Sequence, residues 1–157
     1  MYKFLSNNLI YVFFAISILI LISAYFIEYI LGYEACSLCL IERIPYFFII
    51  TFSLYFIFFK KFKRLVLILI FICFLSSSLI AFYHFGIEQK FFDESLICKI
   101  RSLSQNVTAA ELLQELESNK KSCKNVNFRV LGLSLATINL FISLVLSSIT
   151  FKCINQK

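Results

Sequence analysis

Four long apolar runs without an acidic or basic residue constrain this chain more than any other feature. A bilayer core of about 30 Å needs roughly 20 helical residues, with a range of about 17–25. Three of the runs fit that length, and one, at 16 residues, is short, so its helix begins further back and places Glu42 and Arg43 at the boundary. Lipid offers the backbone no hydrogen-bond partner, so we predict helices. The runs are residues 4–27, 44–59, 65–87 and 130–151.

The predicted fold class is therefore all-α, an integral membrane four-helix bundle forming a single membrane domain over residues 1–157. Of the residues, 61% are hydrophobic and 15% are charged, whereas soluble domains are about 45–50% apolar. The first run is too long for the apolar part of a signal peptide and lacks a small-x-small cleavage site, so we expect it to be retained. We expect helices at about 9–30, 43–59, 65–86 and 130–151, with outer loops at about 31–42 and 87–129.

The basic residues indicate the orientation. Four of the five residues from Lys60 to Arg64 are basic, and both ends of the chain add lysines without any acid. Short basic segments stay in the cytoplasm, so we expect both termini there. The net charge of +6 is thus mostly a topology signal. Because the basic residues are scattered over two membrane sides, we expect no nucleic-acid partner.

The six cysteines sort by membrane side. Cys36 and Cys39 form a C-x-x-C in the first outer loop, and Cys98 and Cys123 lie in the second. We assign no role to the remaining two, Cys73 and Cys153. A metal is not expected, because only half of a zinc pattern exists. A c-type haem needs a histidine directly after the C-x-x-C, and Leu40 occupies that position.

Four outer cysteines can pair in three ways, and the sequence leaves the resting pairing open. We expect Cys36–Cys39 and Cys98–Cys123. The second bond would serve well as a loop staple worth roughly 3 kcal/mol. The first would constrain almost nothing, whereas C-x-x-C pairs are a usual place for tuned thiol pKa values. We therefore favour redox chemistry at Cys36 and Cys39.

Arg43 and His84 are the candidate partners of this pair. Arg43 follows Cys39 by four residues, so in a helix both would share one face, and a fixed cation stabilises a thiolate. The alternative is that Arg43 caps the boundary and pairs with Glu42. Pro45 also allows the helix to begin only near Arg43, with the cysteines in a turn above it. His84, the single histidine, lies near the outer end of the third helix and is either a proton donor and acceptor for a ligand or an interfacial residue without a role.

The second outer loop carries a helix pattern of its own. Residues 108–111 (TAAE) match a capping box, and Leu112, Leu113 and Leu116 follow as a narrow apolar stripe. We predict a short amphipathic helix lying on the membrane or on the bundle.

Taken together, these segments resemble the disulfide bond formation protein B (DsbB) family, the quinone-coupled thiol oxidases of bacterial inner membranes. The resemblance spans nearly the whole chain, and the combination is more specific than any part. Ala35 departs from it, because a proline is common before the first cysteine. The matching segments are CSLCLIER (36–43), YHFGIE (83–88), the pair Cys98 and Cys123, and LGLSLATIN (131–139).

The resemblance implies a relay of disulfides. A periplasmic thioredoxin-like thiol oxidase, of the disulfide bond formation protein A type, would attack Cys98, and Cys123 would then exchange with Cys36. The catalytic residues would be these three and Cys39. Cys39, Arg43 and His84 would form the quinone site.

The implied cofactor is a quinone, either ubiquinone or menaquinone, and no metal. The relay of this family keeps the bacterial periplasm oxidising, so the implied location is the inner membrane, among lipid and coupled to the respiratory chain. Two other interpretations compete: a four-helix membrane scaffold with structural disulfides, and a small transporter. A transporter usually carries ionisable groups near the midplane, and here none lies far from an edge.

Overall fold

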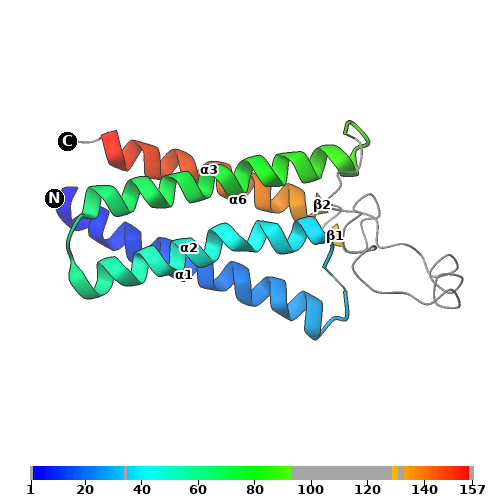
Figure 1. Ribbon diagram of the computed structural model, residues 1–157, viewed down its shortest axis with the longest axis horizontal. Coiled ribbons are helices and arrows are strands. Elements are labelled where there is room, and N and C mark those ends of the chain that lie inside the picture. Colours follow the sequence, from blue (N-terminus) through cyan, green and yellow to red (C-terminus); the bar gives the residue numbers. More distant parts are fainter. Residues whose placement is uncertain (1, 34, 93–128, 131–132, 156–157) are drawn as a thin grey trace, which may run out of the picture.

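The computed structural model describes residues 2–33, 35–92, 129–130 and 133–155. Within them the fold is a bundle of four long helices (Figure 1), and the predicted all-α fold class is confirmed. Each helix is long and apolar enough to cross a membrane. The helices are α1 (Tyr2–Tyr29), α2 (Ser37–Phe59), α3 (Lys63–Glu88) and α6 (Leu135–Asn155).

Successive helices run in opposite directions, so segments that are far apart in the sequence lie together at each end of the bundle (Figure 1). The start of α1, the end of α6 and the α2–α3 link lie together at one end of the bundle (Figure 1). The α1–α2 link and the start of α6 lie at the other, which we call the cysteine end. Helix α3 packs against both α2 and α6, and α1 packs mainly against α2.

An apolar core joins the helices. Phe13 of α1 and Tyr46 of α2 both meet the ring of Phe74 of α3 edge-on, at centroid distances of 5.4 and 6.4 Å. The outward surface is also apolar, with Leu19 62% and Phe141 60% exposed. Exposed side chains of this kind are costly in water, so this surface suits lipid.

Helix α2 begins at Ser37, so the expectation of a start near Arg43 is wrong. Cys36 is the N-cap residue, and its sulfur accepts a hydrogen bond from the Cys39 backbone N–H at 3.3 Å. This contact satisfies one of the free N–H groups of a first turn, as N-cap side chains do. Pro45 lies inside the helix without ending it. Interior prolines are tolerated in membrane helices, where neighbouring groups re-satisfy the backbone.

Helix α6 begins at Leu135, later than the expected start near residue 130. The strands β1 (Arg129–Val130) and β2 (Leu133–Ser134) form a short antiparallel hairpin in front of it. The Ser134 hydroxyl accepts from the Thr137 backbone N–H at 3.2 Å, which fixes the helix start. Cys98, Cys123 and the predicted amphipathic helix lie outside the described residues.

Candidate active site

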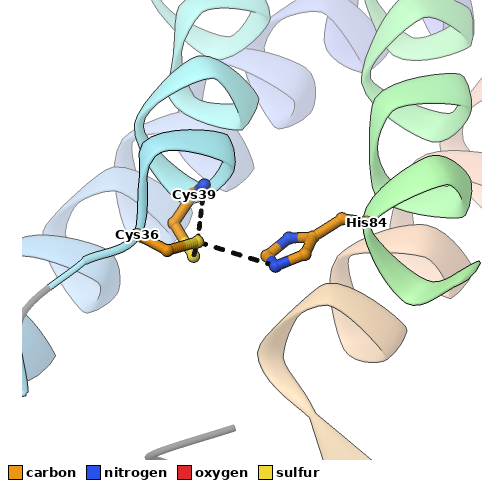
Figure 2. A group of neighbouring side chains, drawn as sticks. All are labelled: Cys36, Cys39 and His84. Carbon is orange, nitrogen blue, oxygen red and sulfur yellow. Dashed lines mark hydrogen bonds between the residues drawn. The ribbon is translucent and has the colours of Figure 1, made fainter. Parts of the chain in front are cut away.

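Two cysteines and a histidine meet at the cysteine end (Figure 2). Cys36 precedes α2 and Cys39 lies in its first turn, with the two sulfurs 2.7 Å apart. His84 reaches across from α3, and its Nε2 lies 3.6 Å from the Cys36 sulfur. Leu38 packs against Ile87 beside them, which anchors the first turn of α2 to α3. The sequence placed these residues at one boundary, and the fold brings them into contact.

The surroundings of Cys36 favour its thiolate. The hydrogen bond with the Cys39 side chain is the largest influence, and the hydrogen bond and positive charge of His84 act in the same direction. Burial opposes them, yet together they lower the pKa of the Cys36 thiol from 9.0 to about 4. The start of a helix also favours an anion, because its free N–H groups and dipole point toward it. Of the two thiols, Cys36 is therefore the one whose thiolate its surroundings stabilise.

His84 is held by a buried acid that the sequence did not single out. Its Nδ1 lies 2.7 Å from Oε1 of Glu42, and a carboxylate can only accept, so the imidazole donates. The side chains are 4% and 10% exposed. This bond turns Nε2 toward Cys36. Nε2 also lies 3.7 Å from Oε1 of Glu88.

Glu42 is fixed in turn by α6. Asn139 donates from Nδ2 to Oε2 of Glu42 at 2.8 Å, and its own Oδ1 accepts from the Tyr46 hydroxyl. The Tyr46 hydroxyl also hydrogen-bonds to the Ser143 hydroxyl at 2.9 Å, and the Ser143 hydroxyl hydrogen-bonds to that of Ser77 at 3.1 Å. Asn139 of α6 thus makes hydrogen bonds to two residues of α2.

The Arg43 side chain contacts α1 and not the helices α3 and α6 that Glu42 contacts. Its guanidinium pairs with Glu28 of α1 at 2.5 Å and lies 4.8 Å from the centre of the Tyr25 ring. The alternative in which Arg43 pairs with Glu42 is wrong, because both Glu42 oxygens accept from His84 and Asn139. Since α2 already includes Cys39, Arg43 lies one helical turn below that cysteine on the same side of the helix.

The sequence missed Glu42 and Glu88 as site residues. Glu42 stands next to Arg43, which suggested a local pair, whereas its true partner is 42 positions away. A usable signal was present: Glu42 and His84 both lie in helices at one predicted boundary of a chain with few charged residues. A buried acid near the only histidine is expected to find it, because an unpaired buried charge is costly.

A dithiol with a stabilised thiolate, set against a buried imidazole at the end of a membrane bundle, defines a membrane thiol–disulfide oxidoreductase. The family model "Disulfide bond formation protein DsbB" matches residues 6–153, and the chain belongs to this family.

A relative from Rickettsia prowazekii (strain Madrid E), described as uncharacterized protein RP370, is 34% identical over 147 residues. The match covers 92% of this chain and 83% of that protein. No solved structure matches the chain. Family and helices together make this a multi-pass inner-membrane protein that forms disulfide bonds.

Proposed function

We propose that this protein reoxidises a periplasmic thioredoxin-like thiol oxidase and passes the electrons to a membrane quinone, either ubiquinone or menaquinone. The observation that carries the proposal is the Cys36–Cys39 pair at the helix start, with His84 beside it. A disulfide becomes a stronger oxidant when its reduced form is stabilised. Stabilising the Cys36 thiolate therefore makes a Cys36–Cys39 disulfide able to accept electrons from an already oxidising partner.

The relay we propose uses two disulfides, Cys36–Cys39 and Cys98–Cys123. A thiolate of the partner attacks Cys98, which breaks the Cys98–Cys123 bond and forms a mixed disulfide. The second partner thiolate then displaces Cys98, so the partner leaves oxidised with two electrons fewer. Cys123 attacks Cys36 and Cys39 leaves as a thiolate. Each step is an attack of a thiolate on a sulfur, so two electrons move inward without loss or gain.

His84 and Glu42 would manage charge during this exchange. The Glu42 carboxylate holds Nδ1, so the ring keeps Nε2 toward Cys36 at 3.6 Å. When the Cys98 thiolate then attacks Cys123 and displaces Cys36, the negative charge that develops on the Cys36 sulfur is met by a fixed donor in a half-buried site. Preorganised groups of this kind act more strongly away from water.

The quinone fits the surroundings of Arg43. A quinone carbonyl needs an N–H donor, and a guanidinium has five, of which Glu28 engages NH1. The neighbouring Ile44 and Phe47 are each 48% exposed on the outer surface, which gives a lipid-soluble head group an apolar approach. When bound, a quinone accepts the two electrons. In this proposal Arg43, Cys39 and His84 bind it.

We also propose the orientation. The cysteine end would face the periplasm, and both termini would be cytoplasmic together with the basic residues Lys60–Arg64. The observation in support is that the start of α1, the end of α6 and this basic link share one end of the bundle. Labelling by an impermeant maleimide in intact cells, after reduction of the outer disulfides, would test it, with labelling expected for Cys98 and not for Cys153.

The deciding experiment is thiol trapping with and without quinone. With a reduced partner and quinone present, Cys39→Ala should stop quinone reduction, and Cys98→Ala should stop partner oxidation. Cys73→Ala is the matched control, because Cys73 lies in α3 away from the pair, and it should leave both reactions unchanged. Quinone reduction that persisted in Cys39→Ala would refute the relay. Disulfides that remain oxidised beside a reduced partner would instead favour the scaffold.

A further inference from the structure

We propose that Cys36, Cys39 and His84, when the pair is reduced, form a site for one soft metal ion, Zn²⁺ or a similar cation, that blocks reoxidation. The two sulfurs and a ring nitrogen of His84 all lie within 4.8 Å of one another. C-x-x-C with a histidine is a common ligand set of zinc, which prefers thiolate and imidazole. Figure 2 shows the three side chains converging from α2 and α3 on one point.

The outer partners of His84 are those of a metal-binding histidine. Such a histidine almost always donates its other ring N–H to a carboxylate or carbonyl, which fixes the tautomer and leaves the ligating nitrogen bare. Here Nδ1 donates to Glu42 at 2.7 Å, and Asn139 secures that carboxylate at 2.8 Å. Nε2 therefore faces the sulfurs as an acceptor whenever the ring is neutral.

The distances suit a tetrahedral ion with little movement. Zinc–sulfur bonds of about 2.3 Å and zinc–nitrogen bonds of about 2.0–2.1 Å put a sulfur and a nitrogen ligand about 3.6 Å apart, and two sulfurs about 3.8 Å apart. Cys36 and His84 are already 3.6 Å apart, and the two sulfurs are 2.7 Å apart. The sulfurs must separate by about 1 Å, which a small side-chain rotation at the start of a helix supplies.

Metal binding and disulfide formation compete for the same atoms. The ion requires both sulfurs as thiolates and a bare Nε2 on His84, so its binding releases the remaining thiol proton and the Nε2 proton of the imidazolium and changes no oxidation state. A disulfide offers no thiolate, so the oxidised protein should not bind the ion. Three protein ligands leave a fourth position open, and Oε1 of Glu88 lies 3.7 Å from Nε2 of His84. The ion should thus act as a reversible inhibitor that sees only the reduced protein.

The test measures metal uptake by reduced full-length protein in detergent, without quinone or partner. Co²⁺ serves as the probe, because cobalt thiolates absorb by charge transfer, and Cys98→Ser/Cys123→Ser is the background that removes the other outer thiols. We expect one Co²⁺ per chain, displaced by Zn²⁺, and none after oxidation. His84→Ala should weaken binding by at least about 100-fold. Glu42→Gln should weaken it by roughly 10–100-fold, the usual effect of losing an outer hydrogen-bond partner.

Cys36→Ser and Cys39→Ser are the matched variants, since each changes one atom and keeps the fold. If either variant, or the oxidised protein, took up as much Co²⁺ as the reduced Cys98→Ser/Cys123→Ser protein, the proposal would be overturned. An unchanged Co²⁺ affinity in His84→Ala would overturn it as well. The binding does not rest on the proposed function, although the inhibition does. A chain that binds Co²⁺ but never oxidises a partner would refute only the function. A working oxidase without Co²⁺ uptake would refute only the metal site.

Discussion

Glu42 and Arg43 are consecutive residues, yet they contact different neighbouring helices from two faces of α2. Glu42 looks onto α3 and α6, where it binds His84 and Asn139 beside Cys36. Arg43 looks onto α1, where it binds Glu28 and lies against Tyr25. Successive residues of a helix point about 100° apart, so neighbours readily meet different helices. The side chains of both residues are almost fully buried.

The different contacts of Glu42 and Arg43 give the two residues different roles, although the sequence suggested that they pair with each other. The face of α2 toward α3 and α6 influences the ionisation of the Cys36 thiol, because Glu42 on this face holds the His84 imidazole next to Cys36. The α1 face holds a cation in a place that opens toward exposed apolar side chains. We therefore expect changes on the first face to alter cysteine chemistry, and changes on the second to alter quinone use.

The largest expected effect is the pH dependence of Cys36 itself. Its pKa is lowered from 9.0 to about 4, so alkylation of Cys36 in the reduced protein should stay on a plateau from neutral pH down to about pH 5. It should fall tenfold per pH unit below 4, where the thiolate is lost. Mass spectrometry of the modified site at each pH gives the midpoint. A midpoint near 9 would contradict the proposed charge environment.

The same shift has a definite sign in stability. The thiolate contributes stability that is fully present above pH 9.0, and that contribution is lost as the pH falls through about 4. Thermal unfolding of the reduced protein should therefore show a fall toward pH 4 that a Cys36→Ser variant lacks.

Replacing His84 should have the next largest effect. His84→Ala removes the donor and positive charge from beside Cys36, and an opposite charge at this range usually moves a pKa by roughly 1–3 units. The alkylation midpoint of Cys36 should rise by that amount. His84→Asn supplies the control, since it keeps a hydrogen-bond donor without the charge. Its alkylation midpoint should lie between those of the unchanged protein and of His84→Ala. An unmoved midpoint in both variants would leave His84 as a packing residue only.

Glu42→Gln should produce a smaller rise in the same midpoint, of about one pH unit, because it keeps the shape but removes the charge that holds His84. Arg43→Gln is the matched control from the next position on the same helix, with similar burial. It should leave the midpoint in place. Equal shifts in both variants would indicate general damage to α2 and would erase the distinction between its faces.

The smallest expected effect on the thiol belongs to Arg43→Lys. Lysine keeps the charge toward Glu28 but loses the planar fork that can serve two acceptors at once. The Cys36 midpoint should not change, whereas the apparent KM for quinone should rise by roughly tenfold. Steady-state quinone reduction at varied quinone concentration measures this. An unchanged KM would reduce Arg43 to a structural partner of α1.

The spans could be predicted from sequence because membrane helices must be long and apolar, and that information is local. The start of α2 at Ser37 could not be predicted from the sequence. A cysteine sulfur served as its N-cap, which is not among the usual capping residues, and Pro45 suggested a later start. The pairing of Glu42 was also hidden, because its partners lie 42 and 97 positions away and only the packing of three helices brings them together.

Part of the site followed from residue types alone. A C-x-x-C at a membrane boundary favoured redox chemistry at Cys36 and Cys39, whereas residue types left a role for His84 open, and the packing of α3 brings it to Cys36 (Figure 2). The partner of Arg43 did not follow, because Glu28 stands near the end of another helix and the sequence offered a nearer acid in Glu42.

The N-cap sulfur of Cys36 also ties backbone protection to the redox state. The Cys39 amide donates to this sulfur, and a negatively charged cap holds a first turn more firmly than a neutral one. Caps of this kind contribute about 1 kcal/mol, which corresponds to roughly a fivefold change in local opening. Amide hydrogen exchange in the first turn of α2 should therefore slow by about that factor on reduction, so that the backbone itself reports whether the pair holds electrons.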